Sequence, residues 1–438
     1  MKFIKRTILT FFSQMITVLL SVIASIVIAR VLGPTEMGIY SIILLTFTLI
    51  GTFGSLGIGI SNTYYGAKKY SSWNRIASNS LISAFLIGIP SIIIFVLVLG
   101  LNSSLLNNID ITLFITASIA IPFLILMPYF QYILLGQNKI KEYNFTNIIQ
   151  GIIYLSLIII VLFIFKGNLW GIIVSWTITS ILASIIPLSI VYKSTKFGLH
   201  FNFNLFKKSV IFGLKGYLGN FINFFNYRID LFFIGLLLNF ANVGYYSISV
   251  SLAEALWYLP GAVGTIVFAR TPGLSDEEVN KSTPQICRNT LFITIIMALI
   301  LFVAGKYVIL ILYGSQYLPA LEPLWVLLPG IVALSICKVL SNEIAGRGKP
   351  IINTYAAIIS LIINVPLNIV LIPKIGIIGS ALSSSISYSI TTIIVLSSFL
   401  KLSQNTLNET LILKKEDVNI YIKILKKLLK LDEEIGSP

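Results

Sequence analysis

Runs of apolar residues about twenty positions long recur from one end of the chain to the other, and short polar segments separate them. A helix of about 20 apolar residues crosses the hydrocarbon core of a bilayer while satisfying its own backbone groups. The pattern therefore predicts an all-α integral membrane protein with about twelve transmembrane helices. The predicted spans are residues 8–32, 38–66, 77–101, 111–135, 145–166, 169–192, 209–237, 241–268, 287–312, 322–345, 351–373 and 376–400.

Two short motifs recur in the same order at nearly one offset along the chain. Residues 38–42 (GIYSI) return as residues 244–248 (GYYSI), and residues 136–139 (GQNK) return as residues 346–349 (GRGK). Weak internal symmetry of this kind is typical of transporters built from two related halves. The repeat predicts two six-helix lobes related by a pseudo-two-fold axis along the membrane normal. The predicted domains are an N-terminal lobe at 1–200, a C-terminal lobe at 201–402 and a cytoplasmic tail at 403–438.

Charged residues are few and unevenly placed. They make up only 11% of the chain, and the mean hydropathy is +0.94, which excludes a soluble globular protein with its usual share of about 25% charged residues. The net charge of +15 at pH 7 is concentrated in alternate loops between the predicted spans, as the positive-inside rule requires. This distribution predicts that both termini are cytoplasmic, and it explains the positive charge without a nucleic-acid partner.

The sequence offers no catalytic or metal-binding constellation. His200 is the only histidine, Cys287 and Cys337 lie in or beside predicted spans, and there is no phosphate-cradling P-loop motif. No loop between the spans is long enough to hold a catalytic domain. We therefore predict that the protein is not an enzyme and uses neither a cofactor nor a metal.

The seventh predicted span carries a polar stripe, and Lys215 and Arg228 flank it. An ionisable residue within a span costs about 2.5–3.5 kcal/mol on insertion scales and marks a functional site by default. The stripe either lines a wet cavity or forms a polar helix–helix seam. We favour the cavity, because a packing seam does not need Lys215, Arg228 and Asp230 together. The members of the stripe, at helical spacing, are Gly216, Asn220, Asn223, Tyr227 and Asp230.

Four further charged residues lie within or at the ends of predicted spans. Arg30 is expected toward the outer side, and Arg270 and Lys338 toward the cytoplasm, so that cations at two depths are available to an anionic headgroup. Ordinary snorkelling to the interface also explains Arg30 and Arg270, and Lys338 either snorkels or pairs with a neighbour. Glu254, with no cation within one helical turn, either exchanges a proton or pairs with a basic residue of the seventh span.

The tail becomes amphipathic after its first dozen polar residues. A helix of this kind rests on the anionic inner leaflet, and a frayed, solvated tail is the alternative. One face of residues 418–430 carries Val418, Ile422, Leu425 and Leu429, and the other carries Lys423, Lys426, Lys427 and Lys430.

Several segments carry a family resemblance. Residues 28–41 read IARVLGPTEMGIYS, residues 252–254 read LAE ahead of a Leu-Pro pair, and residues 346–350 read GRGKP. In this order they resemble the signature segments of bacterial polysaccharide flippases, which belong to the multidrug/oligosaccharidyl-lipid/polysaccharide exporter superfamily. The resemblance covers nearly the whole chain.

The resemblance implies a MATE-like fold in which two six-helix lobes enclose a central cavity that opens alternately to each side. The implied cargo is an undecaprenyl-diphosphate-linked oligosaccharide, moved from the inner to the outer leaflet of the cytoplasmic membrane for O-antigen, capsule or related glycan assembly. Membrane lipids, glycan-assembly proteins and H⁺ or Na⁺ are the implied partners.

The same resemblance gives the candidate residues their implied roles. Basic side chains are expected to meet the diphosphate, because guanidinium and ammonium groups bind phosphate well. Amide and phenol groups are expected to meet sugar hydroxyls, and two carboxylates are candidates for ion coupling. The substrate-binding candidates are Arg30, Lys215, Asn220, Asn223, Tyr227 and Arg228, and the ion-coupling candidates are Asp230 and Glu254.

Three other functions are alternatives to the flippase hypothesis. A drug exporter of the same superfamily is expected to have an acidic, aromatic cavity for cationic cargo, whereas deep basic residues outnumber acids here. A membrane glycosyltransferase or glycan polymerase needs a catalytic loop, and every loop here is short. A purely structural scaffold does not explain the ionisable groups within the spans.

Overall fold

The structure is a computed structural model that describes residues 2–101, 109–417 and 421. Within these ranges the side chains of residues 2–8, 100, 216–218, 220 and 269 are not described. All regular secondary structure in the described ranges is helical, which confirms the predicted all-α class. The predicted amphipathic helix at 418–430 lies outside the described residues apart from Tyr421.

The chain divides into two compact units. Unit 1 comprises Met1–Ser247 and Ile309–Leu318, and unit 2 comprises Ile248–Val308 and Pro319–Pro438. Unit 1 contains α1 (Lys2–Gly54), α2 (Ile58–Ala67), α3 (Trp73–Leu101), α4 (Ile111–Ser118), α5 (Ile121–Gly136), α6 (Ile140–Ile159), α7 (Leu169–Thr195), α8 (Phe203–Leu237) and the first half of α9 (Phe240–Glu254). Unit 2 contains the end of α9, then α10 (Tyr258–Arg270), most of α11 (Asp276–Leu312), α12 (Leu321–Gly346), α13 (Ile351–Ser403) and α14 (Leu407–Leu411).

Two long helices each break in the middle, so each supplies two spans. In α1 the break is at Gly33, whose φ is 75°, and Pro34 follows it; in α13 the break includes Gly376, whose φ is 62°. Glycine adopts positive φ without the steric cost that a Cβ brings. Nine helical stretches of the described chain are long and apolar enough to cross a membrane. Counting α1 and α13 twice and adding the 35-residue α8 gives the twelve predicted spans.

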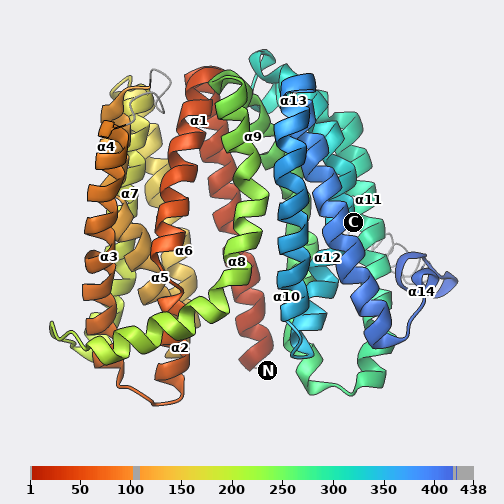
Figure 1. The fold of residues 1–438 in the computed structure, drawn as a ribbon, viewed down its shortest axis with the longest axis horizontal. Helices are drawn as coiled ribbons and strands as arrows, with labels where there is room; N and C mark the ends of the chain where they lie inside the picture. The colour runs from red at the N-terminus through yellow and green to blue at the C-terminus, as the bar shows by residue number, and fades with distance from the viewer. Residues whose placement is uncertain (1, 102–108, 418–420, 422–438) are drawn as a thin grey trace, which may run out of the picture. The chain divides into compact units, whose positions relative to one another are not determined.

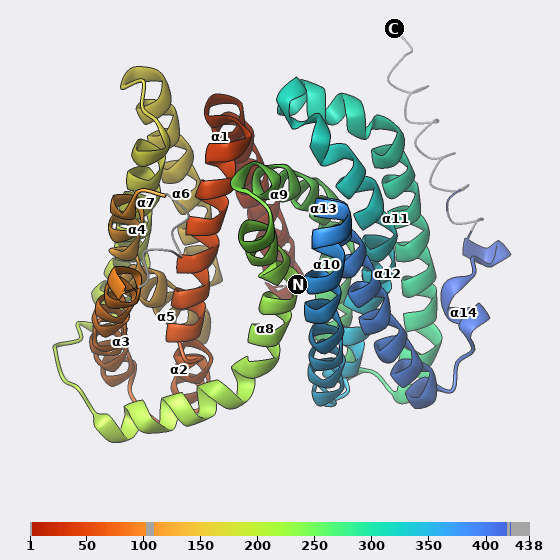
Figure 2. The same ribbon diagram turned by 45° about the horizontal axis from the view of Figure 1, so that its top comes forward.

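Within unit 1, α8 joins the amino-terminal helices. It begins at Asn202, whose side chain accepts a hydrogen bond from the Leu205 N–H (2.9 Å). Its first turns run across the ends of α2 and α3, and the helix then turns to run beside α1 (Figures 1 and 2). Phe212 stacks on Tyr64 of α2 with ring centroids 4.6 Å apart. A Cβ on Gly213 would lie only 2.5 Å from the carbonyl oxygen of Leu56, so the two backbones touch.

The contact units and the predicted lobes divide the chain differently. The units place α8 with the helices that precede it, because α8 packs against α1, α2 and α3. The predicted lobes describe a sequence repeat, which places residues 201–402 together. The two-lobe division therefore stays a prediction.

Unit 2 is built on α12, which packs against α10 and both halves of α13. The segment after α13 folds back onto α11 through a buried ion pair between Arg288 and Asp417. Asp417 also accepts hydrogen bonds from Asn289 Nδ2 (3.0 Å) and from the Lys414 N–H (2.9 Å). Arg288 further donates to the Glu409 carbonyl (3.0 Å).

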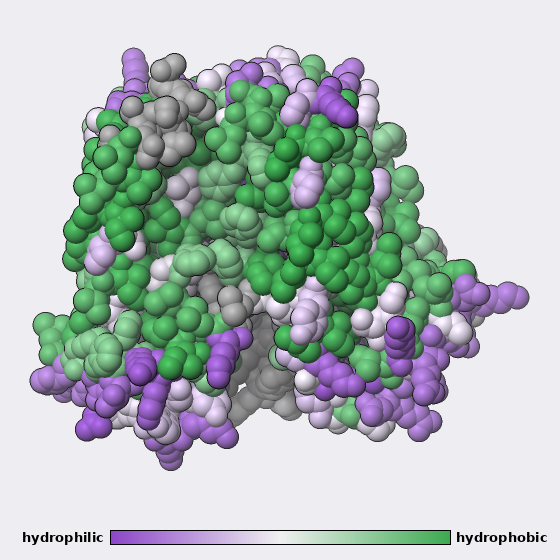
Figure 3. Space-filling view, in the orientation of Figure 1, coloured by the Kyte–Doolittle hydropathy of each residue, from purple (hydrophilic) through white to green (hydrophobic). Residues whose placement is uncertain are grey.

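The surface of unit 1 is that of a membrane-spanning bundle. Over the middle of α3 and α4 the side chains seen in Figure 3 are apolar, and polar side chains gather at the helix ends. Large apolar residues of α3 such as Ile93, Ile94 and Leu97 are more than half exposed. In water this exposure is unfavourable, whereas in lipid it is expected.

Candidate functional site

The predicted polar stripe lies on α8, an unbroken helix over 35 residues. Lys215 is exposed, and Tyr227 and Arg228 are half-buried. Asn223 turns its amide back to its own helix, where Nδ2 donates to the Gly219 carbonyl (3.0 Å). The side chain of Asn220 lies outside the described residues. The stripe therefore presents its charged groups at different degrees of exposure along a single helix.

Asp230, at the end of the stripe, is a packed residue. Its side chain is 1% exposed, and Oδ2 accepts a hydrogen bond from the hydroxyl of Tyr246 (2.7 Å), which is fully buried on α9. Oδ1 accepts from the Leu231 N–H (2.8 Å). A buried carboxylate is stable only where donors satisfy it. Sequence reasoning missed Tyr246, although it belongs to the repeated motif at residues 244–248.

Arg30 binds protein carbonyls in this structure. Its guanidinium Nε donates to the Leu312 carbonyl (2.7 Å), and its Nη2 donates to the Ile311 carbonyl. Both carbonyls lie at the end of α11. The last carbonyls of a helix have no partners within the helix and carry partial negative charge, so a guanidinium suits them. Beside this contact, the Tyr317 hydroxyl donates to the Ala29 carbonyl (3.0 Å). Arg30 therefore links segment 309–318 to α1 through hydrogen bonds.

Glu254 lies in unit 2 close to a lysine of another helix. It is the last residue of α9, half-buried, and a 3₁₀ turn (Ala255–Trp257) separates it from α10. It interacts electrostatically with Lys338 of α12, whose ammonium lies 4.5 Å from the ring centroid of Trp257. The Trp257 ring in turn packs edge-on against Tyr388 of α13. From the sequence, a basic residue of the seventh span was the candidate partner for Glu254, whereas the structure places Lys338 of α12 beside it.

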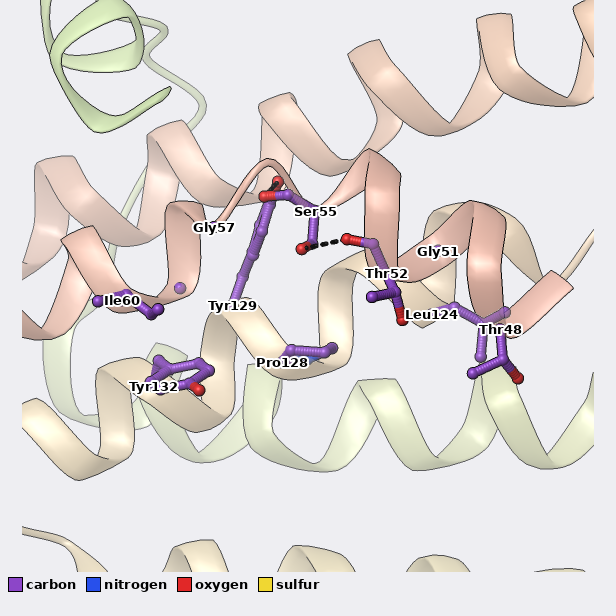
Figure 4. Close-up of a pocket in the computed structure, with 11 residues that line it drawn as sticks. Thr48, Gly51, Thr52, Ser55, Gly57, Ile60, Leu124, Pro128, Tyr129 and Tyr132 are labelled. Atoms are coloured by element: carbon purple, nitrogen blue, oxygen red, sulfur yellow. Dashed lines mark hydrogen bonds between the residues drawn. The ribbon is translucent and has the colours of Figure 1, made fainter. Parts of the chain in front are cut away.

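A cavity of about 310 Å³ lies within unit 1, where α1 ends and α2 begins beside α5 (Figure 4). None of its lining residues is charged. The Tyr129 hydroxyl donates to the Ser55 carbonyl (2.9 Å) and closes one side. Four glycines crowd this segment, at positions 51, 54, 57 and 59, where small residues allow close packing and also let a helix bend. The signal that the sequence analysis missed was Thr48 and Thr52, one helical turn apart. The lining residues are Thr48, Gly51, Thr52, Ser55, Gly57, Gly59, Ile60, Leu124, Pro128, Tyr129 and Tyr132.

Comparison with known proteins decides the family. The model of the family described as polysaccharide biosynthesis protein matches residues 3–276 of this chain. The chain belongs to the polysaccharide biosynthesis protein family. The matched residues include α8, Arg30 and Glu254, and they end before Lys338.

Two curated relatives of this polysaccharide biosynthesis family member are glycan transporters by name. The "Putative O-antigen transporter" of Shigella flexneri is 24% identical over 405 residues, which cover 88% of this chain and 95% of that protein. The "Probable low-salt glycan biosynthesis flippase Agl15" of Haloferax volcanii is 23% identical over 207 residues. That second match covers 46% of this chain and 42% of the archaeal protein, less than half of its length.

Solved structures show the fold of this family member. The "Lipid II flippase MurJ" in its inward closed conformation superposes with a TM-score of 0.76 at 20% identity, over 97% of this chain and 96% of that one. An inward-facing multidrug resistance MATE family transporter of the MOP superfamily gives a TM-score of 0.71 at 12% identity, over 91% and 99% of the two chains. The polysaccharide biosynthesis family member therefore has a MATE-like fold, and its long apolar helices make it a multi-pass membrane protein. Its family and its relative named as an O-antigen transporter point to a transporter rather than an enzyme.

Proposed function

We propose that the protein is a flippase that moves undecaprenyl-diphosphate-linked oligosaccharide from the inner to the outer leaflet of the cytoplasmic membrane by alternating access. The observation that carries this proposal is the family match over residues 3–276, on a fold similar to that of the lipid II flippase MurJ. The relative named as an O-antigen transporter aligns over 95% of its own length and supports the same cargo class. Both termini are assigned to the cytoplasm, on the distribution of basic loops.

In this proposal the diphosphate meets the cations of α8. Lys215 and Arg228 supply charge-assisted donors, and Asn220, Asn223 and Tyr227 supply hydrogen bonds to sugar hydroxyls. Arg30 binds the diphosphate only in a conformation in which its hydrogen bonds to the Ile311 and Leu312 carbonyls are broken. The polyprenyl chain stays in the bilayer, since its transfer into a polar cavity is unfavourable.

Ion coupling is assigned to the carboxylates within the spans. Half-buried Glu254 beside Lys338 and buried Asp230 beside Tyr246 are the two candidates, because a carboxylate within a span changes its interactions strongly when it binds H⁺ or Na⁺. Dissipation of a proton or sodium gradient is therefore expected to slow transport.

Deletion of the gene in its host tests the cargo. We expect loss of surface glycan together with accumulation of its polyprenyl-linked precursor, and restoration of both by the plasmid-borne gene. A MATE-like drug exporter predicts instead greater sensitivity to cationic drugs with normal surface glycan. A glycan polymerase predicts that single repeat units still reach the surface. Either of these two outcomes contradicts the flippase assignment.

A further inference from the structure

The cavity in unit 1 lies between two tight contacts of α5 with the α1–α2 segment. On one side, a Cβ on Gly51 would lie 2.8 Å from Leu124 Cβ. On the other side, a Cβ on Gly59 would lie 2.4 Å from Cδ2 of the Tyr132 ring, so this ring rests directly on the backbone. Between the two contacts α1 ends at Gly54 and α2 begins at Ile58, and the break opens the space.

Polar groups without partners line this space. The hydroxyls of Thr48 and Thr52 form no hydrogen bond with any residue in the described ranges, and Figure 4 shows both side chains pointing from α1 toward α5. By contrast, the hydroxyl of Thr46 on the same helix donates to the Ile42 carbonyl (2.8 Å). On the opposite wall Pro128 has no N–H to give to the carbonyl of Leu124, its partner one turn earlier. Both threonines are half-buried, so their hydroxyls are accessible to a polar ligand that enters the cavity.

The chemistry of the walls selects the ligand. Because no charged residue lines the cavity, it has no cation to bind a diphosphate. An acyl chain forms no hydrogen bonds with the hydroxyls that line it. Hydroxyls and the face of a tyrosine ring together suit a neutral sugar ring, which donates and accepts hydrogen bonds at its edge and presents C–H groups on its face. The volume of about 310 Å³ is at the lower end of the roughly 300–1,000 Å³ found for ligand pockets.

We propose that this cavity is a binding site for a neutral sugar ring of the transported glycan, with Thr48 and Thr52 as its hydrogen-bonding residues. The proposal rests on the flippase function and adds to it a subsite separate from the cations of α8. The sugar and the diphosphate are then recognised by different residues, so variants separate the two binding contributions.

Binding by the purified full-length protein in lipid nanodiscs tests the site with two probes. One probe is the polyprenyl-linked glycan extracted from host membranes, and the other is undecaprenyl diphosphate, which lacks a sugar. The double variant Thr48→Val, Thr52→Val keeps the shape of both side chains and removes both hydroxyls, and Thr46→Val is the matched control. Two neutral hydrogen bonds correspond to a loss of about tenfold in affinity.

We expect the double variant to lose about tenfold in affinity for the glycan lipid and to bind undecaprenyl diphosphate as the wild type does, which also shows that it is folded. Thr46→Val is expected to bind both probes normally. Unchanged glycan-lipid affinity in the double variant overturns the sugar site and leaves the flippase function standing. An equal loss for both probes also overturns it, because the cavity then serves the lipid. A wild type that binds neither probe rejects the flippase function and this site with it.

Discussion

Gly38 and Gly244 pack against each other reciprocally. A Cβ on Gly38 would lie 1.7 Å from the carbonyl oxygen of Phe240, and a Cβ on Gly244 would lie 2.0 Å from the carbonyl oxygen of Pro34. Each contacted carbonyl lies one helical turn before the other glycine. The two copies of the sequence repeat thus meet through equivalent backbone positions, which allows α1 and α9 to approach more closely than any side chain would permit.

Alanine at either of these glycines is expected to destabilise the protein. The added methyl group cannot fit without moving a backbone, and overpacking of this kind costs about 1–3 kcal/mol. Gly261 on α10 is the matched control, because nothing lies within 4 Å of the position of its Cβ. Thermal unfolding in detergent checks the prediction. Gly244→Ala is expected to lower the Tm relative to Gly261→Ala, and equal Tm values would contradict the packing argument.

Removal of the Arg30 side chain is expected to loosen segment 309–318. Arg30→Ala leaves the Ile311 and Leu312 carbonyls without their donor, so the amides of this segment open more often. Hydrogen–deuterium exchange of peptides that cover residues 309–318 measures this directly, and we expect exchange several times faster. Lys306→Ala removes a nearby exposed charge as a control. Exchange that stays at the wild-type rate in Arg30→Ala would show that the guanidinium does not hold the segment.

The docking of the tail onto α11 is expected to depend on pH through Asp417. Burial alone raises the pKa of this carboxyl, but hydrogen bonds from Arg288, Lys414 and Asn289 outweigh it and hold the pKa at about 2, below the usual 3.8. A lowered pKa in the folded state stabilises the contact above the unfolded value. The stabilisation is therefore complete above pH of about 4 and is lost as the pH falls toward 2.

A spin label on the exposed Lys415→Cys position reports whether the tail is docked. We expect low mobility at neutral pH, a rise in mobility between pH 4 and 2, and high mobility at neutral pH in Asp417→Asn. Asp276→Asn removes an exposed carboxylate that lies 3.4 Å from Arg347 and serves as the control. A label that is equally mobile with and without the Asp417 carboxylate at neutral pH would contradict this contact.

The helical spans, and the breaks within α1 and α13 that separate some of them, were predictable because they depend on local sequence. Apolar run length predicted the spans, and the gap between the predicted spans 8–32 and 38–66 contains Gly33 and Pro34, where the structure places the break within α1. The partners of the charged residues were not predictable, because they depend on helix packing. Glu254 and Lys338 interact across 84 positions of the chain, and Arg30 meets carbonyls at Ile311 and Leu312. Every residue has a backbone carbonyl, so the pattern of side chains does not indicate which carbonyl an arginine binds.

The cavity was hidden from sequence for a related reason. Its space comes from the break between α1 and α2, which is a feature of backbone geometry. The glycines at 51, 54, 57 and 59 indicated close packing, which the structure shows at Gly51 and Gly59. Only the placement of α5 against the break turns that packing into a space with unused hydroxyls.

Replacement of Glu254 by glutamine is expected to uncouple transport from the ion gradient. Glutamine keeps the shape of the side chain but neither binds a proton nor carries the charge that acts on Lys338. Transport by Glu254→Gln should therefore no longer change when the proton and sodium gradients are collapsed one at a time. Glu322→Gln, at the first turn of α12, is the control. A variant that still responds to collapse as the wild type does would remove Glu254 from the coupling mechanism.

The most direct test of the account is glycan-lipid flipping by purified protein in proteoliposomes, measured as access of the glycan to a glycosidase added outside. Wild-type protein is expected to expose the glycan faster than protein-free vesicles do. Lys215→Ala and Arg228→Ala should each slow this step by about tenfold or more, because each removes charge-assisted bonds to the diphosphate. Lys141→Ala, an exposed lysine on α6, should flip at the wild-type rate. Flipping no faster than in empty vesicles, or both α8 variants at the wild-type rate, would contradict the central claim.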